Sequence, residues 1–596
     1  MPSSAGPSDP PGTPVVGSFL ADRRKALLYG SAAVFAGVAG GAWRLGAQTL
    51  PQPADWPSWA PSLREHYRRV EDLRSDAVDI RRFGAAADGV TDDSRAFRQA
   101  LASGARAILL PANAIIALAS AVSIDRPVAI LGSGSGSGIR LVGEAKSLFE
   151  IRPAAPDPGQ WVRDCIFDSI SFSRPRGSGG TAITAYNVRG LRVSRCQSDG
   201  LNLAVVRHMR QLLNLYSRRK GSLERDPAVV AGFNASGSDL NEDILICDNQ
   251  VDYGRYQGAI LRFEFARRVT VFNNDGRFAK ISWWGGGARI SEGGALEHLR
   301  RVRDVYIADN RLRGANGGVY GNNGQNVVVA RNVIRDMTDV GVDFEGCLDC
   351  LAYNNDVRNV GNFCYATFYA AANIVFRDNY GEQNGSGATL HERFGRGRYG
   401  APKGIYLAAL RSANFAKVRD AITVSFIDNR FVWTGRSGFG ACAPSFFEEL
   451  VLRGNVFDNV VCDWTFRQTQ TMRAIGNVFR FDRAPEADQA ILSSSAAEFV
   501  AQGNRFDLPQ GVGTQLKVLH YTSSYRTSSA LIERNTATAG NAGIALHADR
   551  RPKMISLQGN SVDSLTVSGD LPPNVLRLDG NFNAQGRAIS VQRTAS

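Results

Sequence analysis

Several residue types that carry chemistry are scarce in this chain of 596 residues. Only 6 are His and 8 are Cys. The one CxxC pair, Cys347 and Cys350, has no second CxxC and no paired His, which argues against a zinc site. We expect the cysteines to be buried thiols or to form one local disulfide. No run of basic residues interleaved with aromatics occurs, so we expect no nucleic-acid partner.

Lysine is scarce as well. Of the 69 basic residues 8 are Lys and 61 are Arg, and with 56 acidic residues the net charge is +13. Arginine binds carboxylates and phosphates through two parallel hydrogen bonds, so an acidic partner is one interpretation and a general preference for Arg is the other. A hydrophobic fraction of 44% and a charged fraction of 21% are typical of a folded soluble protein.

Residues 1–47 are expected to form a polar n-region and a twin-arginine-like signal. Arg23 and Arg24 precede an apolar, Gly/Ala-rich run from Ala26 to Ala42. The run is short for a stable transmembrane helix, and both cleavage near Ala47 and retention as an uncleaved anchor remain open. We therefore expect export to the periplasm or the cell exterior, with membrane contact only through this segment. A linker is expected over residues 48–77.

A short apolar run that ends in Asn recurs along most of the chain. Most successive spacings between these asparagines lie between 21 and 27 residues. We interpret the spacing of 36 as one unit with an insertion and the spacing of 50 as two units. The aligned residues are Asn249, Asn274, Asn310, Asn332, Asn355, Asn379, Asn429, Asn455, Asn477, Asn504, Asn535, Asn560 and Asn581.

This period fits one turn of a parallel β-helix with about three short strands, each paired with its equivalent in the next turn. Asparagine tolerates the left-handed conformation at a bend, and stacked amides can form a hydrogen-bonded ladder. Leucine-rich repeats share the period but need an LxxLxL frame that is absent here. We expect the β-helix to span residues 136–596, with insertions near 205–240 and 383–420.

Three aspartates crowd the segment FGAAADGVTDDSRAF, residues 83–97. We interpret them as structural: Asp88 opens a turn, Thr91 caps a helix, and Asp92 and Asp93 lie in its first turn. The helix would cover the exposed end of the solenoid with one apolar stripe. That stripe is formed by Ala96, Phe97, Ala100 and Leu101. Residues 78–135 are therefore expected to form an N-terminal cap and first coil.

The pattern FGAxADGVTDD, followed by a helix and then ILLP, resembles the N-terminal signature of the pectate-lyase-like superfamily, in its polygalacturonase-related branch. The resemblance covers residues 78–150 by motif and the repeat region by architecture. It implies an all-β, right-handed single-stranded parallel β-helix with an N-terminal capping helix, and a polysaccharide-directed role. The NTD, DD, GHG and RIK motifs of polygalacturonases and the WxDH and RxPxxR motifs of pectate lyases are absent. No catalytic residue of the family therefore maps onto this chain.

The candidate site lies in GVDFEGC, residues 341–347. Val342 and Phe344 should face the core, so Asp343 and Glu345 should both face solvent, with Cα atoms about 6.5 to 7 Å apart. The pair suits the acid and base of an inverting glycosidase. Alternatively it holds Ca²⁺ for β-elimination of a uronide, and apart from Ca²⁺ no cofactor is expected. A solvated strand face without catalytic function is the third interpretation.

Equal offsets from the aligned asparagines are expected to place Trp284, Tyr320, Asp343 and Tyr365 in one stack, with Asn322 and Glu345 two residues on. Arg255 precedes the corresponding strand one turn earlier, where it would bind an acidic sugar. The predicted substrate-binding set is Trp283, Trp284, Tyr320, Asn322, Tyr365 and Arg255. The expected function is an exported enzyme that cleaves a polysaccharide, as a glycoside hydrolase or a lyase. The alternative is a non-catalytic polysaccharide-binding or cell-envelope protein. A tailspike-like adhesin is disfavoured by the export signal.

Overall fold

The computed structural model describes most of the chain after residue 50. The described residues are 51–596 except 135, 156, 158, 175–178, 210–239, 255–256, 286–301, 369–370, 387–403, 410–422, 446–447, 463–469, 486–488, 511–515, 539–540, 584, 590 and 594–596. They belong to one compact unit, Gln48–Ser596. The expected export signal, Arg255 and most of both expected insertions lie outside the described residues. No helix within the described part is long and apolar enough to cross a membrane.

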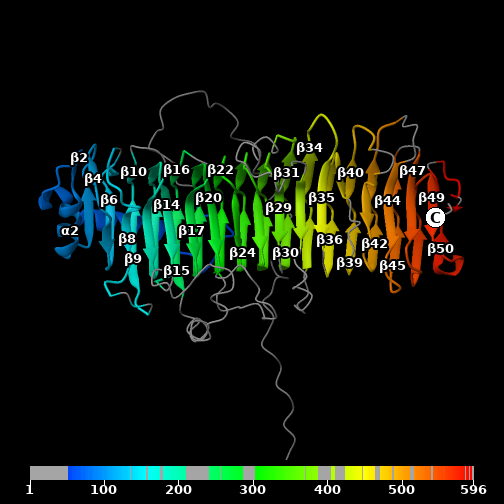
Figure 1. Ribbon diagram of the computed structural model, residues 1–596, viewed down its shortest axis with the longest axis horizontal. Helices are drawn as coiled ribbons and strands as arrows, with labels where there is room; N and C mark the ends of the chain where they lie inside the picture. Colours follow the sequence, from blue (N-terminus) through cyan, green and yellow to red (C-terminus); the bar gives the residue numbers. More distant parts are fainter. Residues whose placement is uncertain are drawn as a thin grey trace, which may run out of the picture. The chain divides into compact units, whose positions relative to one another are not determined.

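The chain winds through three parallel sheets, called A, B and C here, and nearly every turn adds one strand to each in that order. Figure 1 shows the successive turns side by side, from β4 near the beginning of the unit to β49 near its end. Sheet A has 18 strands and sheet B has 16 in the described part of the chain, and sheet C runs from β5 to β51.

The strands of sheet A are β1 (Val78–Asp79), β3 (Ala107–Leu110), β6 (Val128–Gly132), β9 (Val162–Asp168), β12 (Val188–Ser194), β15 (Asn241–Cys247), β18 (Ala266–Phe272), β21 (Val302–Ala308), β24 (Gly324–Ala330), β27 (Leu348–Tyr353), β30 (Ala372–Arg377), β33 (Thr423–Ile427), β36 (Glu449–Arg453), β39 (Thr471–Ile475), β42 (Glu498–Gln502), β45 (Ser529–Glu533), β48 (Met554–Gln558) and β50 (Leu576–Asp579).

The strands of sheet B are β2 (Asp88–Asp92), β4 (Ile115–Leu118), β7 (Gly138–Leu141), β10 (Ser171–Ser173), β13 (Gln197–Asp199), β16 (Gln250–Asp252), β19 (Asp275–Arg277), β22 (Arg311–Arg313), β25 (Val333–Arg335), β28 (Asp356–Arg358), β31 (Tyr380–Gln383), β34 (Arg430–Trp433), β37 (Val456–Asp458), β40 (Val478–Arg480), β43 (Arg505–Asp507) and β46 (Thr536–Ala537).

The strands of sheet C are β5 (Val122–Ile124), β8 (Ser147–Ile151), β11 (Thr181–Tyr186), β14 (Asn202–Arg207), β17 (Gly258–Glu264), β20 (Ala279–Trp284), β23 (Val319–Asn322), β26 (Val342–Glu345), β29 (Phe363–Phe368), β32 (Gly404–Ala409), β35 (Gly440–Ser445), β38 (Val460–Cys462), β41 (Leu492–Ser494), β44 (Leu516–Ser523), β47 (Ala542–Ala548), β49 (Ser564–Gly569) and β51 (Val591–Arg593).

At every other position of each strand the side chain points inward, and these side chains fill the interior. In sheet B, for example, the paired strands align Phe457, Phe479 and Phe506, and all three rings are buried. The ring centroids of Phe457 and Phe479 are 4.8 Å apart, and those of Phe479 and Phe506 are 5.0 Å apart. Identical residues therefore stack along the axis at the strand spacing, and the parallel β-helix expected from the sequence is confirmed.

Every aligned asparagine from Asn249 to Asn581 belongs to one hydrogen-bonded ladder. The Nδ2 atom of each donates to the Oδ1 atom of the next, over 2.8–3.0 Å. The backbone N–H of each donates to that same Oδ1 atom; Asn332 N, for example, lies 2.9 Å from Asn355 Oδ1. The amides are buried, so the ladder satisfies polar groups that would otherwise be costly.

Two details of the predicted repeat are wrong. Asn379 bonds directly to Asn429, so the spacing of 50 residues is one turn with insertions rather than two turns. The left-handed residue at the bend is the one before each ladder asparagine, such as Asn354 (φ 54°) before Asn355, because the ladder residue itself must aim its amide along the axis. The spacing of 36 is one turn with an insertion, as expected.

The N-terminal aspartates shape the chain, as the sequence predicted, but the helix begins later than expected. Thr91 is not its cap: Asp88–Asp92 form β2, and α2 (Ser94–Ala102) follows Asp93. Asp93 accepts hydrogen bonds from the backbone N–H groups of Ala86 (2.7 Å) and Ala87 (3.1 Å). Asp93 thus fixes the loop before α2, whereas Asp92 Oδ1 accepts from the backbone N–H of Ser94, the first residue of the helix, over 3.0 Å. The expected apolar stripe of α2 packs into the core.

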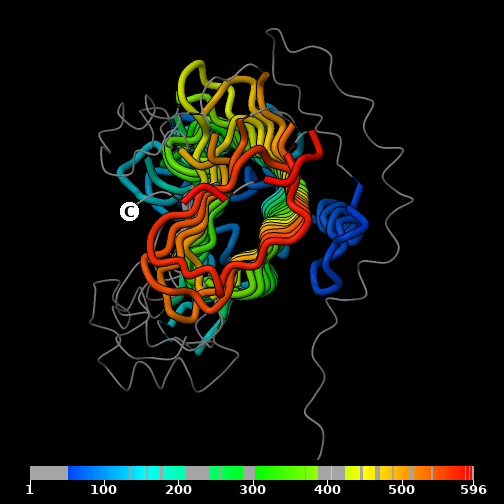
Figure 2. Tube along the Cα trace, turned by 90° about the vertical axis from the view of Figure 1, so that its right-hand side faces the viewer, coloured from blue at the N-terminus to red at the C-terminus, as the bar shows by residue number. Residues whose placement is uncertain are grey.

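A second helix, α1 (Leu63–Ser75), forms in the segment expected to be a linker. It lies against the outer face of sheet A, outside the stacked coils in Figure 2. Val70 packs on an outward apolar patch of that sheet, and His66 Nε2 lies 2.9 Å from Ser194 Oγ. Burial lowers the pKa of His66 to about 4, with the charge of Arg192 as the next cause. Within the described ranges, the remaining helical segments are two short 3-10 turns, η2 (Ile80–Phe83) and η5 (Pro573–Val575).

Candidate active site

The outward face of sheet C brings the candidate carboxyls next to aromatic and polar side chains from neighbouring turns. The strands that carry them, β20, β23, β26 and β29, lie in the middle of the row of strands in Figure 1. Their register creates two outward rows. The first row is Ser282, Tyr320, Asp343 and Ala366; the second is Trp284, Asn322, Glu345 and Phe368.

The rows differ from the predicted stack, because the offset from the ladder asparagine is not constant. Ser282 lies 8 residues after Asn274, whereas Asp343 lies 11 residues after Asn332. Trp284 consequently aligns with Asn322 and not with Tyr320.

Two residues of the predicted substrate-binding set lie inside the core. Trp283 is fully buried, and its ring centroid is 6.1 Å from that of Phe344. Tyr365 aligns with the inward Val342 and donates its hydroxyl to the backbone oxygens of Asn355 (3.0 Å) and Tyr380 (2.8 Å). Both side chains belong to the hydrophobic core. Side chains alternate along a strand, so an outward Trp284 requires an inward Trp283. Because both Trp283 and Tyr365 face inward, we remove them from the substrate-contacting set.

Asp343 faces away from the core, as expected, but it is only 2% exposed. It lies between Tyr320 and Ala366, which belong to an outer apolar cluster with Val340 and Phe363. Burial in this cluster, together with the charge of Glu345, raises the pKa of Asp343 well above its usual value. Both effects disfavour the charged form of Asp343, and because its side chain is buried we assign it no direct contact with a substrate.

Glu345 is the member of the pair that reaches solvent. Burial raises its pKa from 4.5 to about 7, and the nearby charge of Asp339 adds to the effect. Asp339 is a half-buried residue just before β26, and it was not predicted from the sequence. A carboxyl that titrates near neutral pH can donate or accept a proton at physiological pH, which is the property that a general acid or base requires.

Cationic side chains lie beside the carboxyls on the same face. Lys280 Nζ donates to the hydroxyl of Tyr320 over 2.6 Å and to Asn316 Oδ1 over 2.9 Å. Arg262, which aligns with Ser282 from the preceding turn, lies 5.9 Å from the ring of Trp284. Sequence reasoning missed Lys280 and Arg262. The alternation in Ala279–Trp284, which turns Lys280 and Trp284 to the same side, was the signal that could have identified Lys280.

Three buried polar atoms on this face lack a hydrogen-bond partner among the described residues: Ser282 Oγ, Asn322 Nδ2 and Asp343 Oδ1. They come from three adjacent strands, β20, β23 and β26. Asn322 uses only its Oδ1 atom, which accepts from Gly285 N over 3.3 Å. Buried polar groups are rarely left unpaired, so a cluster of them indicates a place where water or a ligand binds.

The residues do not fit the calcium ion that the sequence allowed. No group of three or more His, Cys, Asp or Glu side chains that could hold a metal occurs within the described ranges. Ca²⁺ takes six to eight oxygen ligands and favours ionised carboxylates, whereas the pKa values of Asp343 and Glu345 are both raised. We therefore derive no step through calcium.

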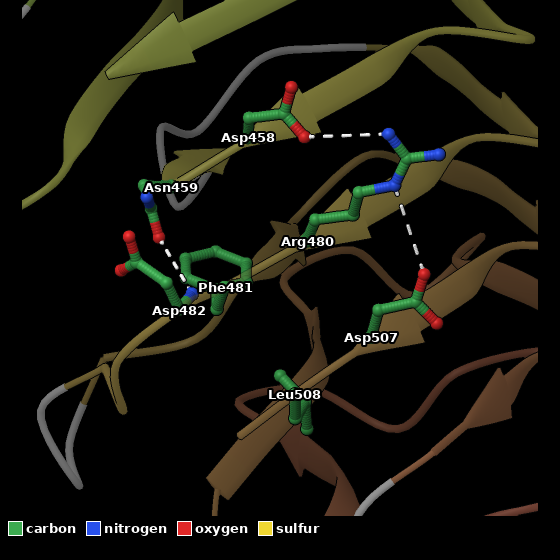
Figure 3. Close-up of a pocket in the computed structure, with 7 residues that line it drawn as sticks. All are labelled: Asp458, Asn459, Arg480, Phe481, Asp482, Asp507 and Leu508. Atoms are coloured by element: carbon green, nitrogen blue, oxygen red, sulfur yellow. Dashed lines mark hydrogen bonds and ion pairs between the residues drawn. The ribbon is translucent and has the colours of Figure 1, made fainter. Parts of the chain in front are cut away.

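A hollow of about 330 Å³ lies away from this face, at the edge of sheet B around Arg480. Figure 3 shows the Arg480 guanidinium between Asp458, 3.8 Å away, and Asp507, 3.9 Å away. Asn459 Oδ1 accepts from the backbone N–H of Asp482 over 3.1 Å. The carboxylates of this hollow are also paired with neighbouring arginines, such as Asp458 with Arg430 and Asp507 with Arg505, so we do not place the active site there.

No family model and no curated protein matches the sequence. Among solved structures, the chain is similar to the N-terminal fragment of bacteriophage phi29 gene product 12, with 13% identity over 89% of this chain and 95% of that chain and a TM-score of 0.40. It is also similar to the tailspike protein gp49 of Pseudomonas phage LKA1 (12%, 84% and 81%, TM-score 0.38). A third likeness is to the catalytic unit of a GH87 α-1,3-glucanase from Streptomyces thermodiastaticus (12%, 90% and 70%, TM-score 0.30).

These likenesses are too weak to identify what this chain binds or cleaves. The parallel β-helix is established by the strand pairing itself, and no family is assigned.

Proposed function

We propose that this protein is an enzyme that cleaves a polysaccharide on the outward face of sheet C, with Glu345 as the proton-transferring residue. The observation that carries the proposal is the raised pKa of Glu345, about 7, on a face that also holds two aromatic rings. Trp284 and Tyr320 are half-buried there, and aromatic rings of this kind can stack on pyranose rings.

The surrounding residues have distinct roles in this proposal. Protonated Glu345 donates its proton to the oxygen of the leaving sugar, and burial keeps that proton in place up to about pH 7. Asp343 is a positioning residue, because its nearly complete burial keeps it from the substrate. Lys280 and Arg262 supply positive charge, so an acidic polysaccharide is the substrate class that we favour.

The second carboxyl of a hydrolase would be Asp339, whose charge already acts on Glu345. Elimination is the competing reaction, in which a base removes a proton from a uronide ring carbon. The product distinguishes the two: both reactions create a new reducing end, but only elimination leaves an unsaturated uronide, at the new non-reducing end.

A non-catalytic polysaccharide-binding protein is the second candidate. It is favoured by the 2% exposure of Asp343, which leaves one accessible carboxyl where the sequence predicted two. A binding protein would keep the aromatic rings and the cations without needing Glu345.

Export remains part of the proposal. The twin-arginine pattern at Arg23 and Arg24 would carry the protein to the periplasm or beyond, where polysaccharides are accessible. The apolar segment after it would be the point of membrane contact if it is not cleaved.

The test is to incubate the purified protein with acidic and neutral polysaccharides and to measure new reducing ends and unsaturated uronides. Reducing ends without unsaturation indicate a hydrolase, and unsaturation indicates a lyase. Binding without either product supports the second candidate and contradicts catalysis. Glu345→Gln is expected to lower the rate by about 100-fold or more. Glu498→Gln, at an exposed position of sheet A, is the matched control and is expected to keep the wild-type rate.

A further inference from the structure

A second cluster of reactive side chains lies on the outward face of sheet C near its C-terminal end. Strand pairing aligns Thr522 of β44, His547 of β47 and Ser568 of β49 in one row. Figure 1 shows these three strands near the end of the unit. His547 Nδ1 lies 2.8 Å from Ser568 Oγ, and His547 Nε2 lies 3.0 Å from Asp549 Oδ1.

The carboxylate fixes the role of each ring nitrogen. A carboxylate only accepts hydrogen bonds, so the Nε2 atom of a neutral His547 must carry the proton that it donates to Asp549. The Nδ1 atom then has a lone pair and accepts from the Ser568 hydroxyl. The hydroxyl also lies 3.4 Å from the backbone oxygen of Leu546, which is the longer and weaker alternative.

The cluster is accessible and its geometry is fixed on several sides. The side chain of His547 is 37% exposed and that of Asp549 is 41% exposed. Ser524 Oγ lies 3.5 Å from the second carboxylate oxygen of Asp549. Ser568 stands at the end of its strand, and Gly569 after it has φ of 77°; a Cβ atom there would lie 2.4 Å from Ala548 O. This glycine turns the chain away directly after Ser568.

We propose that Ser568, His547 and Asp549 form a serine esterase site. Ser568 Oγ adds to the carbonyl carbon of a carboxylic ester while His547 Nδ1 takes its proton, and Asp549 stabilises the resulting imidazolium. The ester C–O bond then breaks and the alcohol leaves with the proton from His547. Water attacks the acyl-serine and gives its proton to His547, which returns it to Ser568 Oγ as the carboxylic acid departs. One ester and one water give one acid and one alcohol.

The position of the cluster points to the substrate class. This inference of the substrate class rests on the proposed function. β47 follows β26 by seven strands of the same sheet, or about 34 Å at the usual strand spacing. A polysaccharide bound along the outward face at Glu345 could therefore also reach Ser568. The neighbouring outward row is His520, Ala545, Thr566 and Gln592, and beside His547 and Ser568 it has the smaller residues Ala545 and Thr566, which suits a short acyl group such as acetyl. We infer that the site removes short acyl esters from the polysaccharide.

The test uses the full chain with a fluorescent fluorophosphonate, which labels activated serines, and with p-nitrophenyl acetate. We expect an adduct on Ser568 by mass spectrometry, and none on the Ser568→Ala variant. His547→Gln is expected to lower ester hydrolysis by about 100-fold or more. Glu498→Gln, at an exposed position of sheet A, is the folding control and should be labelled like the wild type. No adduct on Ser568, or unchanged hydrolysis by Ser568→Ala, would overturn the proposal.

The substrate class is tested separately by measuring acetate released from an acetylated polysaccharide. Release by the wild type and by Glu345→Gln, but not by Ser568→Ala, is expected. Hydrolysis of p-nitrophenyl acetate without release from any acetylated polysaccharide would refute the substrate class. Glu345→Gln must keep the fluorophosphonate label, so a failure of the proposed cleavage reaction and a failure of the esterase site give different results.

Discussion

The raised pKa of Glu345 makes a specific prediction about stability and pH. In the folded protein its pKa is about 7, against 4.5 for an unperturbed glutamate. Between these values the folded state holds a proton that the unfolded state has lost, so the contribution of Glu345 to stability is highest below pH 4.5 and falls as the pH rises towards 7. The difference corresponds to roughly 3 kcal/mol at about 1.4 kcal/mol per pKa unit.

Glu345→Gln removes this titration, and the variant should therefore gain stability relative to the wild type as the pH rises. For a unit of this size, with about 2.1 cal/mol/K of unfolding entropy per residue, roughly 3 kcal/mol corresponds to a Tm difference of about 3 °C. Thermal unfolding followed by circular dichroism from about pH 4 to about pH 9 measures it. The two proteins should coincide at the acid end, separate between pH 4.5 and about 7, and keep a constant difference above that pH.

Glu498→Gln is the control, since an exposed carboxyl on sheet A should give a variant whose Tm follows the wild type at every pH. A constant difference between Glu345→Gln and the wild type across the whole pH range would refute the reasoning. So would a difference that grows at acid pH.

Three further outcomes are expected. Asn355→Ala leaves two buried donors of the preceding ladder residue without their acceptor. It should lower the free energy of unfolding by about 2 to 6 kcal/mol in chemical denaturation. Asn574→Ala, at an exposed position, should change that free energy little. Trp283→Ala should destabilise the fold by about 3 to 5 kcal/mol. Trp284→Ala should weaken polysaccharide binding in calorimetry with little loss of Tm. The reverse result would contradict the strand register. Because the pKa of His66 is lowered, its contribution to stability falls as the pH drops from 6.5 to about 4. Hydrogen exchange in α1 should therefore rise over that range. Equal protection of α1 at both pH values would contradict this prediction.

The repeat could be predicted from the sequence because its signal is chemical as well as periodic. In the turns from Asn249 to Asn581 an Asn occupies one bend, and its amide both donates to and accepts from the neighbouring turns. The ladder therefore appears in the sequence as a fixed residue after an apolar run. The insertion after Asn379 was misread as an extra turn, because spacing alone cannot separate a turn from a loop of the same length.

The candidate site was predicted less well, because side-chain direction depends on register to the single residue. Offsets of 8 to 11 residues from the ladder displaced Trp284 by one row and placed the inward Tyr365 in the outward stack. Asp343 was correctly expected to face outward. Its burial could not be predicted, because the apolar side chains that cover it, such as Phe363, come from an adjacent turn.

Docking of α1 was also beyond sequence reasoning. Its residues read as a polar linker, with few apolar positions such as Leu63 and Val70, and their partners on sheet A are distant in the chain. The esterase cluster could not be predicted from the sequence for the same reason. Ser568 and His547 are 21 residues apart and meet only because β47 and β49 pair in register.

The most direct measurement of the central claim is the release of new reducing ends from an acidic polysaccharide that the wild type cleaves, compared among the wild type, Glu345→Gln and Glu498→Gln. The proposed role of Glu345 predicts that the wild type and Glu498→Gln cleave at the same rate and that Glu345→Gln is slower by about 100-fold or more, with its binding to the polysaccharide retained. Cleavage by Glu345→Gln at the wild-type rate would contradict it.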